Sequence, residues 1–327
     1  MITLSIIIVN WNSKVWIKKC IDSIQSQTYR DYEIILVDNA SSDDSLLFVK
    51  QNYPSIKVIP NSQNYGFGVA NKIGITNANG SHILLLNVDT WIETDFLDRI
   101  MHFFNSNNYD LIGVKETSYS DSQSHSSGSH LYTCDLFGYF SYINKTPNQH
   151  KLFYIPGFCM LFKKILYQDT GGFDSAMFMY YEDLDWCWRL HLFGKKIYLH
   201  DQIHIHHAEQ GTQKKKVTNA QKFLWRNTNL LRTVLKNYST KTLIIILPLI
   251  LLQNLLEIIL LTLLLKPSLA YTYIQAWIIN LSDIREICQL RSQIQKNRQI
   301  SDHQIISKMY WGNGRLQHLL RDYRKLF

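Results

Sequence analysis

Four short apolar runs in the first ninety residues limit the fold more than any other feature of this sequence. They are rich in β-branched residues, are separated by segments with helical spacing, and occupy positions 4–9, 33–38, 56–59 and 82–89. Strands without polar alternation are buried on both faces, which is typical of a parallel sheet covered by helices. We therefore predict an α/β fold with a Rossmann-like, doubly wound and mostly parallel sheet.

Polar side chains stand at the ends of three of these runs. Asn10 follows the first, Asp38 ends the second, and Asn87 and Asp89 end the fourth. Ligands of doubly wound sheets bind beyond the carboxyl ends of the strands, so these side chains mark a predicted site. The pair Asn87 and Asp89 suits a divalent cation that holds a diphosphate, although each segment also has good turn chemistry. No G-x-G-x-x-G follows the first run, which argues against a dehydrogenase.

The stretch YYEDLDWCWR, residues 180–189, places three carboxylates among aromatic rings. If a helix begins near Glu182, Asp185 and Arg189 form an i,i+4 ion pair, and Asp183 points about 100° away from that face. A structural explanation of these three carboxylates is that the helix dipole favours acids at a helix N-terminus. A functional explanation is that one of them takes part in catalysis or binding.

Cysteine usage and charge indicate a compartment and a partner. The five cysteines form no CxxC or zinc spacing, which suits a reducing compartment. The first run lacks a basic n-region and a cleavage site, so we interpret it as a strand and not as a signal peptide.

From residue 214 onward the chain carries 18 Lys and Arg against 5 Asp and Glu, whereas the part before it carries 16 against 21. This basic and apolar tail suits an anionic membrane surface, and no nucleic-acid motif is recognisable.

Residues 242–265 form the most apolar segment of the chain. As a helix this segment would be roughly 35 Å long, enough to cross the apolar core of a bilayer. A narrow polar stripe of Gln253, Asn254 and Glu257 favours instead a helix in the membrane interface. Residues 269–281 would form the second limb of a membrane-dipping hairpin, with Tyr and Trp at the headgroup level. A buried core helix and a true crossing are the alternatives.

Six blocks of sequence occur in an order and at spacings that resemble one known family. They are SIIIVNWN, ILVDNASSDDS, NYGFGVANKIGI, ILLLNVD, GGFDSAMFMYYEDLDWCWRL and HHAEQGT. Together they resemble the family-two inverting glycosyltransferases of the GT-A fold over about residues 1–240. The likeness is greatest to the bacterial rhamnosyltransferase-like branch that builds O-antigen and other cell-surface polysaccharides. The tail resembles these proteins only in its basic and hydrophobic, membrane-associating character.

The resemblance implies a nucleotide-sugar site at the end of the sheet. Asp38 would bind the pyrimidine base, and the backbone near Val9 and Asn10 would complete that pocket. Asn64 and Gly66 would line the cleft for the nucleotide and the diphosphate.

The resemblance also implies a metal site for Mg²⁺ or Mn²⁺. Asn87 and Asp89 stand where the family has its DxD motif, and Asp89 would hold the cation. The first carboxylate of that motif is Asn here, which implies a weaker metal site. His206 matches the family's late histidine and would complete the metal shell, with His204 and His207 as close alternatives.

The acceptor side follows from the same resemblance. Asp183 matches the general base of the family's ED motif and is the predicted catalytic residue. Glu182 and Trp186 would contact the substrate, although at helical spacing one of Trp186 and Trp188 also fits a core position. Gly157, within YIPGFCM, would allow the acceptor to approach a neighbouring wall closely.

The predicted organisation has two parts. Residues 1–212 would be a GT-A catalytic domain, with a nucleotide-sugar half over about 1–114 and an acceptor half over about 115–212. Residues 213–327 would form a basic, helical, membrane-associating tail. The polar stretch 117–150 is interpreted as a long loop or an insertion at the rim of the site.

The predicted function is metal-dependent, inverting transfer of a sugar from a pyrimidine nucleotide-sugar to a lipid-linked saccharide. The first choice of donor is dTDP-rhamnose, and the pathway would be O-antigen (lipopolysaccharide) or capsule-type polysaccharide biosynthesis. A UDP-hexose or UDP-N-acetylhexosamine donor is the second choice. The enzyme would lie on the cytoplasmic face of the inner membrane, peripheral or dipping into it. A non-catalytic nucleotide-sugar-binding membrane protein is the alternative from another class, and intact Asp89, Asp183 and the late histidine argue against it.

Overall fold

The chain forms two compact units that interleave along the sequence. The computed structural model describes residues 2–120, 123–125, 130–144, 152–208, 217–312 and 314–315. Unit 1 comprises Met1–Ser129, Ile155–Phe178 and Lys196–Lys216, and unit 2 comprises His130–Tyr154, Met179–Lys195 and Val217–Phe327. The sequence suggested a single boundary near residue 212. The structure instead assigns two earlier segments to unit 2.

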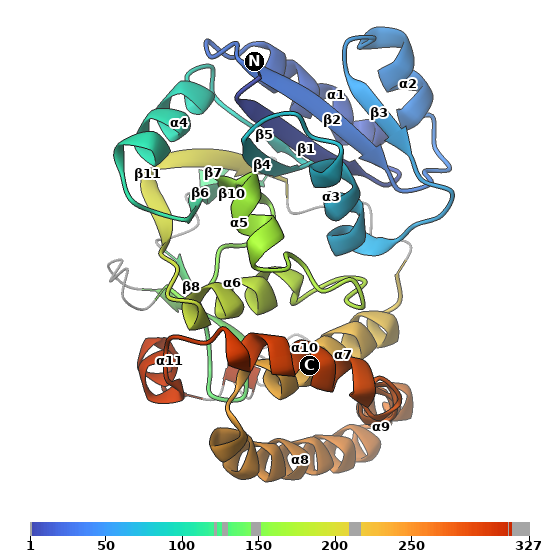
Figure 1. The fold of residues 1–327 in the computed structure, drawn as a ribbon. Helices are drawn as coiled ribbons and strands as arrows, with labels where there is room; N and C mark the ends of the chain where they lie inside the picture. The colour runs from blue at the N-terminus through green and yellow to red at the C-terminus, as the bar shows by residue number, and fades with distance from the viewer. Residues whose placement is uncertain are drawn as a thin grey trace. The chain divides into compact units, whose positions relative to one another are not determined.

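Unit 1 contains the predicted parallel sheet. Four strands lie in the order β3-β2-β1-β4 and are parallel: β1 (Leu4–Asn10), β2 (Tyr32–Asp38), β3 (Lys57–Pro60) and β4 (His82–Asn87). The helices that follow the first three strands are α1 (Lys14–Gln25), α2 (Ser45–Asn52) and α3 (Gly66–Thr76). Figure 1 shows these blue strands side by side with their helices. Most apolar residues of β1, β2 and β4 are buried, as their sequence predicted, whereas Val58 and Ile59 of β3 are only partly buried.

The other half of the sheet contains both parallel and antiparallel strands. Its last strand in the sequence, β11, ends next to the residues that follow β4. Its members are β5 (Thr90–Trp91), β6 (Leu111–Ser120), β7 (Gln123–His125), β10 (Cys159–Lys163) and β11 (Ile197–His207). Strand β10 is antiparallel to β4 and β6, and β11 is parallel to β6. Strand β11 also pairs antiparallel with β5. Helices α4 (Phe96–Ser106) and α5 (Lys164–Asp169) belong to the same unit.

Unit 2 combines a hairpin with helices. Its strands are β8 (His130–Cys134) and β9 (Phe140–Asn144), and its helices are α6 (Glu182–Leu192), α7 (Asn219–Asn237), α8 (Thr240–Leu263), α9 (Pro267–Ser282), α10 (Ile284–Lys296) and α11 (Asp302–Lys308). Helix α7 packs against α6, α9 and α10, and α8 packs against α9. The last four helices form the orange-to-red part of Figure 1.

The prediction of a long loop over residues 117–150 was wrong for the described part of that stretch. Residues 130–134 and 140–144 pair as the antiparallel hairpin of β8 and β9, and residues 123–125 pair with β6. Leu131, Tyr132 and Thr133 are buried in succession, so the strand lacks the polar alternation that reveals a half-exposed strand. The remainder of the stretch lies outside the described residues.

The polar stripe of helix α8 lies on its buried side, beside a few apolar residues, and most of its apolar residues are exposed. Its buried residues are Ile246, Ile250, Asn254, Glu257 and Leu261. Its exposed residues include Ile244, Ile245, Leu249, Leu251, Leu252, Leu255, Leu256, Ile259, Leu260 and Leu263. The predicted polar stripe therefore faces the interior of unit 2, and the apolar side faces outward. Among the described helices, α8 is the one that is long and apolar enough to cross a membrane, with a mean hydropathy of 2.5.

Candidate active site

The carboxyl ends of β1, β2 and β4 bring predicted nucleotide-binding residues together at one edge of the unit 1 sheet. In the strand register, Asn10 pairs with Asp38, and Val9 pairs with Asn87. Asn10 Nδ2 donates to Asp38 Oδ1 at 2.7 Å, and both side chains are buried. The Ser41 amide donates to Asp38 Oδ2 at 3.1 Å. These bonds fix the orientation of the Asp38 carboxylate at the strand end.

Asn39, directly after Asp38, holds the predicted donor-binding loop against this edge. Its Nδ2 donates to Asn64 Oδ1 at 2.9 Å and to Gly66 O at 3.1 Å. Its Oδ1 accepts from Asn61 Nδ2 at 2.9 Å. Sequence reasoning missed Asn39, although its position after a buried strand was the same signal that identified Asp38.

Gly66 begins α3 at a point where no side chain fits. Its φ is +81°, in the left-handed region, and a Cβ there would lie 2.1 Å from Phe178 O. The Phe67 amide donates to the same carbonyl at 2.9 Å. The requirement for glycine therefore comes from close backbone approach within unit 1. Its predicted role in lining the nucleotide cleft stays a prediction.

Strand β11 brings a histidine against Asp89. His207 pairs with Thr90 in the register of β11 and β5. His207 Nε2 lies 3.3 Å from Asp89 Oδ1, and its Nδ1 lies 2.8 Å from Glu116 Oε2. Burial lowers the pKa of His207, but hydrogen bonds to the two carboxylates outweigh burial and raise the pKa to about 10. Asp89, which is buried, and the partly buried His207 and Glu116 thus form one group of contacting side chains.

His206 occupies different surroundings from those its predicted role requires. Its Nε2 lies 2.7 Å from Glu93 Oε1, and its ring stacks on Trp91 with centroids 5.3 Å apart. Of the three histidines that the sequence left open, His207 is the one that the structure brings against Asp89, and the metal-binding role of His206 stays a prediction. Side chains alternate between the two faces of a strand, so an error of one residue selects the opposite face.

The metal site that the sequence predicted at Asp89 stays a prediction, and the structure adds His207 beside that carboxylate. Among the described residues, no group of three or more His, Cys, Asp and Glu side chains could hold a metal ion. A carboxylate and an imidazole leave positions for diphosphate oxygens and water, which suits Mg²⁺ or Mn²⁺. Such a cation would replace the proton on His207, because an imidazole binds a metal in its neutral form.

The segment that contains Gly157 runs beside the end of β4. The Asn87 amide donates to Phe158 O at 3.0 Å, and the Phe158 ring lies with its centroid 5.2 Å from that of His207. Gly157 itself is buried. The predicted wall therefore lies in unit 1 next to Asn87 and His207, and its role toward an acceptor stays a prediction.

The stretch with the predicted general base lies in unit 2 and begins with two strained residues. Tyr180 and Tyr181 have φ values of +69° and +72°. Left-handed backbone at non-glycine residues costs about 1–3 kcal/mol each and gathers at functional sites. Helix α6 begins at Glu182, as predicted, and its first turn contains Glu182, Asp183 and Asp185. These acids interact favourably with the helix dipole.

Asp185 is a structural carboxylate. It is fully buried, and Arg189 Nε donates to its Oδ2 at 3.0 Å, which confirms the predicted i,i+4 pair. Lys236 Nζ lies 3.1 Å from Asp185 Oδ1, and Asn237 Nδ2 donates to the same oxygen at 3.2 Å. Removing one partner of a buried ion pair costs about 3–5 kcal/mol. Asp185 therefore joins α6 firmly to α7.

Trp186 and Trp188 are both fully buried. Trp188 packs edge-on against Phe153 and Tyr238, with centroids 5.4 Å and 4.8 Å away. A ring without an exposed face cannot stack on a sugar. The predicted contact between Trp186 and the substrate is therefore corrected, and the residue belongs to the core.

Glu182 and Asp183 differ in their exposure. Glu182 is buried, and its Oε2 has no hydrogen-bond partner among the described residues. Burial raises the pKa of Glu182 well above 4.5, and the charge of Asp183 adds to this effect. Asp183 is only partly buried, and its Oδ1 accepts from Leu184 N at 2.7 Å. Burial therefore favours the neutral form of Glu182, and Asp183 is the carboxylate of this pair that reaches the surface.

Solved structures identify the fold as GT-A. The structure of S. aureus TarS 1–349 in complex with UDP matches with a TM-score of 0.52 at 16% identity, over 72% of this chain and 66% of that chain. The structure of GalNAc-T7 with UDP, GalNAc and Mn²⁺ matches with a TM-score of 0.59 at 15% identity, over 74% of this chain and 49% of that chain. At these identities the likeness concerns the fold alone.

Sequence comparison identifies the family. Residues 5–169, about half of the chain, match the model of glycosyl transferase family 2, and the chain belongs to this family. The low-salt glycan biosynthesis hexosyltransferase Agl10 of Haloferax volcanii is 27% identical over 194 residues, which are 57% of this chain and 61% of the relative. The poly(ribitol-phosphate) beta-glucosyltransferase of Bacillus spizizenii is 36% identical over 114 residues, 33% of this chain and 18% of the relative. The match covers 61% of the length of Agl10, and it covers 14% and 29% of the lengths of two other glycosyltransferase relatives. This chain therefore spans less than two thirds of each of these three relatives.

Replacement of Glu182 by Gln tests whether this buried carboxyl is neutral in the folded protein. An acid whose pKa rises on folding makes the protein less stable as the pH climbs above 4.5, because the unfolded chain then ionises more readily. The Glu182→Gln variant cannot ionise. It should melt at a higher temperature than the wild type at about pH 8 and at nearly the same temperature at about pH 4. Thermal scans measure the difference, and a difference independent of pH would contradict the neutral carboxyl.

Proposed function

We propose that this protein is an inverting glycosyltransferase with Asp183 as its general base. The observation that carries the proposal is the contrast among the three carboxylates at the start of α6. Asp185 is neutralised by Arg189 and Lys236, Glu182 is buried with a raised pKa, and Asp183 reaches the surface. Membership of glycosyl transferase family 2 supports sugar transfer as the reaction class.

The proposed chemistry is a single displacement. A sugar hydroxyl is a weak nucleophile until a carboxylate takes its proton in the transition state. The acceptor oxygen forms a bond to the anomeric carbon, and the bond from that carbon to the nucleoside diphosphate breaks. The proton passes to the Asp183 carboxylate, and the diphosphate leaves with the bonding electron pair. Attack opposite to the leaving group inverts the anomeric configuration.

Residues of unit 1 would bind the donor. The fixed carboxylate of Asp38, with the backbone of Val9 and Asn10, would receive the pyrimidine base. Asn64 and Gly66, which Asn39 holds at the sheet edge, would line the site for the nucleotide and the diphosphate.

Asp89 and His207 would hold the divalent cation. When bound, Mg²⁺ or Mn²⁺ offsets the negative charge of a diphosphate. Glu116 accepts a hydrogen bond at His207 Nδ1 and so orients the ring with Nε2 toward Asp89. Asn87 begins the same turn and would contact the diphosphate side of the donor.

The donor sugar and the acceptor follow from similarity. The sequence resemblance favours dTDP-rhamnose. A UDP-linked hexose or N-acetylhexosamine is the second candidate, and a hexosyltransferase and a glucosyltransferase among the relatives support it. A lipid-linked saccharide in O-antigen or capsule-type biosynthesis is the proposed acceptor. A donor panel with released nucleoside diphosphate as the readout decides between the two candidates.

Helix α8 would place the enzyme on a membrane surface, on the cytoplasmic face. Its apolar side is exposed, whereas Glu257 on its other side forms an ion pair of 2.8 Å with Arg315. Gln253 Nε2 donates to Glu257 Oε1 at 3.0 Å, so both carboxylate oxygens of Glu257 have partners within unit 2. An apolar face directed outward and a net positive tail suit a helix that lies in the interface of an anionic membrane.

Asp183→Asn should lower turnover by about 100-fold or more, because the variant cannot accept the proton of the acceptor hydroxyl. Donor affinity should change little. Turnover is measured as nucleoside diphosphate release, and affinity by calorimetry. Asp185→Asn is the matched comparison on the same helix. It weakens a buried pair with Arg189 and Lys236, so its main effect should be a lower melting temperature. Near-normal turnover in Asp183→Asn would remove Asp183 as the base.

His207→Ala should weaken the Mn²⁺-dependent binding of UDP or dTDP by about tenfold or more, as expected for loss of a metal ligand. His206→Ala is the control, since this residue is adjacent in β11 but faces Glu93 and Trp91. Calorimetry with and without chelator measures both variants. Equal losses in the two variants, or a loss that persists in chelator, would contradict the assignment of His207.

Replacing Leu252 and Leu256 together by Glu should release the protein from anionic vesicles, because both residues lie on the exposed side of α8. Leu47→Glu is the control, since Leu47 is as exposed as Leu252, at 55%, but lies in unit 1. Cosedimentation with vesicles of phosphatidylglycerol measures the effect. If wild-type protein stays in the supernatant, the proposed membrane contact is wrong.

A further inference from the structure

We propose that Asn229 is a positioning residue for the turn that presents Asp183, and that α7 thereby sets the direction of the general base. The proposal rests on the proposed function, because it concerns how the base of that reaction is held. It assigns a role to α7, a helix that lies outside the six sequence blocks that resemble the glycosyltransferase family.

Asn229 makes two hydrogen bonds to the backbone just before α6. Its side chain is 3% exposed. Its Nδ2 donates to Met179 O at 2.9 Å and to Tyr180 O at 2.8 Å. The two protons of one amide thus satisfy two consecutive carbonyls.

These carbonyls belong to the strained turn. Tyr180 and Tyr181 are both left-handed, and large residues keep this conformation only where their surroundings fix it. Tyr181 is followed directly by Glu182 and Asp183. A shift of Tyr180 or Tyr181 toward an ordinary φ would rotate the start of α6 and redirect the Asp183 carboxylate.

The same helix contacts α6 at a second point. Lys236 and Asn237 follow Asn229 by seven and eight residues, which is two turns along α7, and their side chains bind Asp185. Asn229 fixes the backbone before α6, and Lys236 with Asn237 fixes its first turn. Two points of attachment determine both the position and the rotation of α6, which one point alone would leave free.

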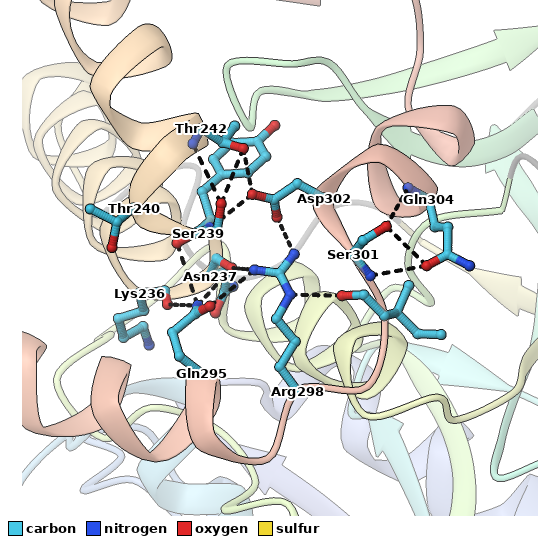
Figure 2. A network of polar contacts seen from close by, with 12 residues as sticks. Lys236, Asn237, Ser239, Thr240, Thr242, Gln295, Arg298, Ser301, Asp302 and Gln304 are labelled. Carbon is cyan, nitrogen blue, oxygen red and sulfur yellow. Dashed lines mark hydrogen bonds and ion pairs between the residues drawn. The ribbon is translucent and has the colours of Figure 1, made fainter.

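The C-terminal end of α7 is itself held in place, as Figure 2 shows. Gln295 Nε2 donates to Lys236 O and to Asn237 O, each at 3.1 Å. Asp302 accepts from the Ser239 amide at 2.9 Å and from Arg298. The carbonyls at the end of α7 are therefore partnered by α10 and the segment after it, and α7 is a fixed support for the turn.

Asn280 provides a matched control for a merely structural effect. It is 2% exposed, and its Nδ2 also donates to two backbone carbonyls, Thr228 O at 3.0 Å and Ala276 O at 2.8 Å. It lies in α9 and has no hydrogen bond to the turn. Asn280→Leu and Asn229→Leu therefore remove the same kind of contact from the same unit.

The experiment compares full-length wild type, Asn229→Leu, Asn280→Leu and Asn229→Gln. We expect Asn229→Leu to lower kcat at least tenfold with KM for the donor within twofold, and Asn280→Leu to keep kcat within twofold at a similar loss of melting temperature. Asn229→Gln retains the amide and should recover part of kcat. Equal kcat losses in both leucine variants, or a normal kcat in Asn229→Leu, would overturn the proposal.

Two further outcomes are decisive. If Asn229→Leu and Asn229→Gln fail to fold while Asn280→Leu folds, Asn229 serves folding alone and the proposal is wrong. If the wild type itself transfers no sugar with any donor and acceptor tried, the proposed function fails. The affinity for the donor is measured by calorimetry in every variant, and an unchanged value shows that the donor-binding residues of unit 1 are intact. This measurement distinguishes failure of the proposed function from failure of the proposal for Asn229.

Discussion

A fully buried carboxylate is tolerated only when cations neutralise it, and the organisation of this protein depends on how Asp185 meets that condition. Arg189 is supplied by the same helix, but Lys236 lies 51 residues further along the chain. The charge therefore brings α6 against α7. The segment that contains α6 belongs to unit 2, between the segments of unit 1 that end at Phe178 and begin at Lys196.

Local signals in the sequence were sufficient for much of this structure. The four parallel strands, the start of α6 at Glu182 and the pair of Asp185 with Arg189 depend on residues that are close in the chain. Each is governed by a short period or a fixed helical spacing, so the sequence predicts it. The position of Asp38 at a strand end followed from the same logic.

What the sequence could not predict depends on partners that are distant in the chain or on one step of register. Asn229 acts through two backbone carbonyls, and no residue-type pattern marks such a contact. His206 and His207 are chemically identical neighbours, and only the pairing of β11 with β5 decides which one faces Asp89. Trp186 looked available for a sugar because aromatic residues on a short helix suit both a core and a binding surface.

Interleaving also affects the order in which this chain is able to fold during its synthesis. At about 5–20 residues per second, Lys236 leaves the ribosome roughly 3–10 s after Asp185. The parallel strands of unit 1 are complete by residue 87 and form from early segments, whereas α6 has no counter-charge from α7 during this interval. Trp188 has Phe153 as a partner during this time but still lacks Tyr238, which is synthesised later. A chaperone that recognises exposed aromatic segments would therefore bind most readily to Met179–Lys195, the segment of unit 2 that lies between two segments of unit 1.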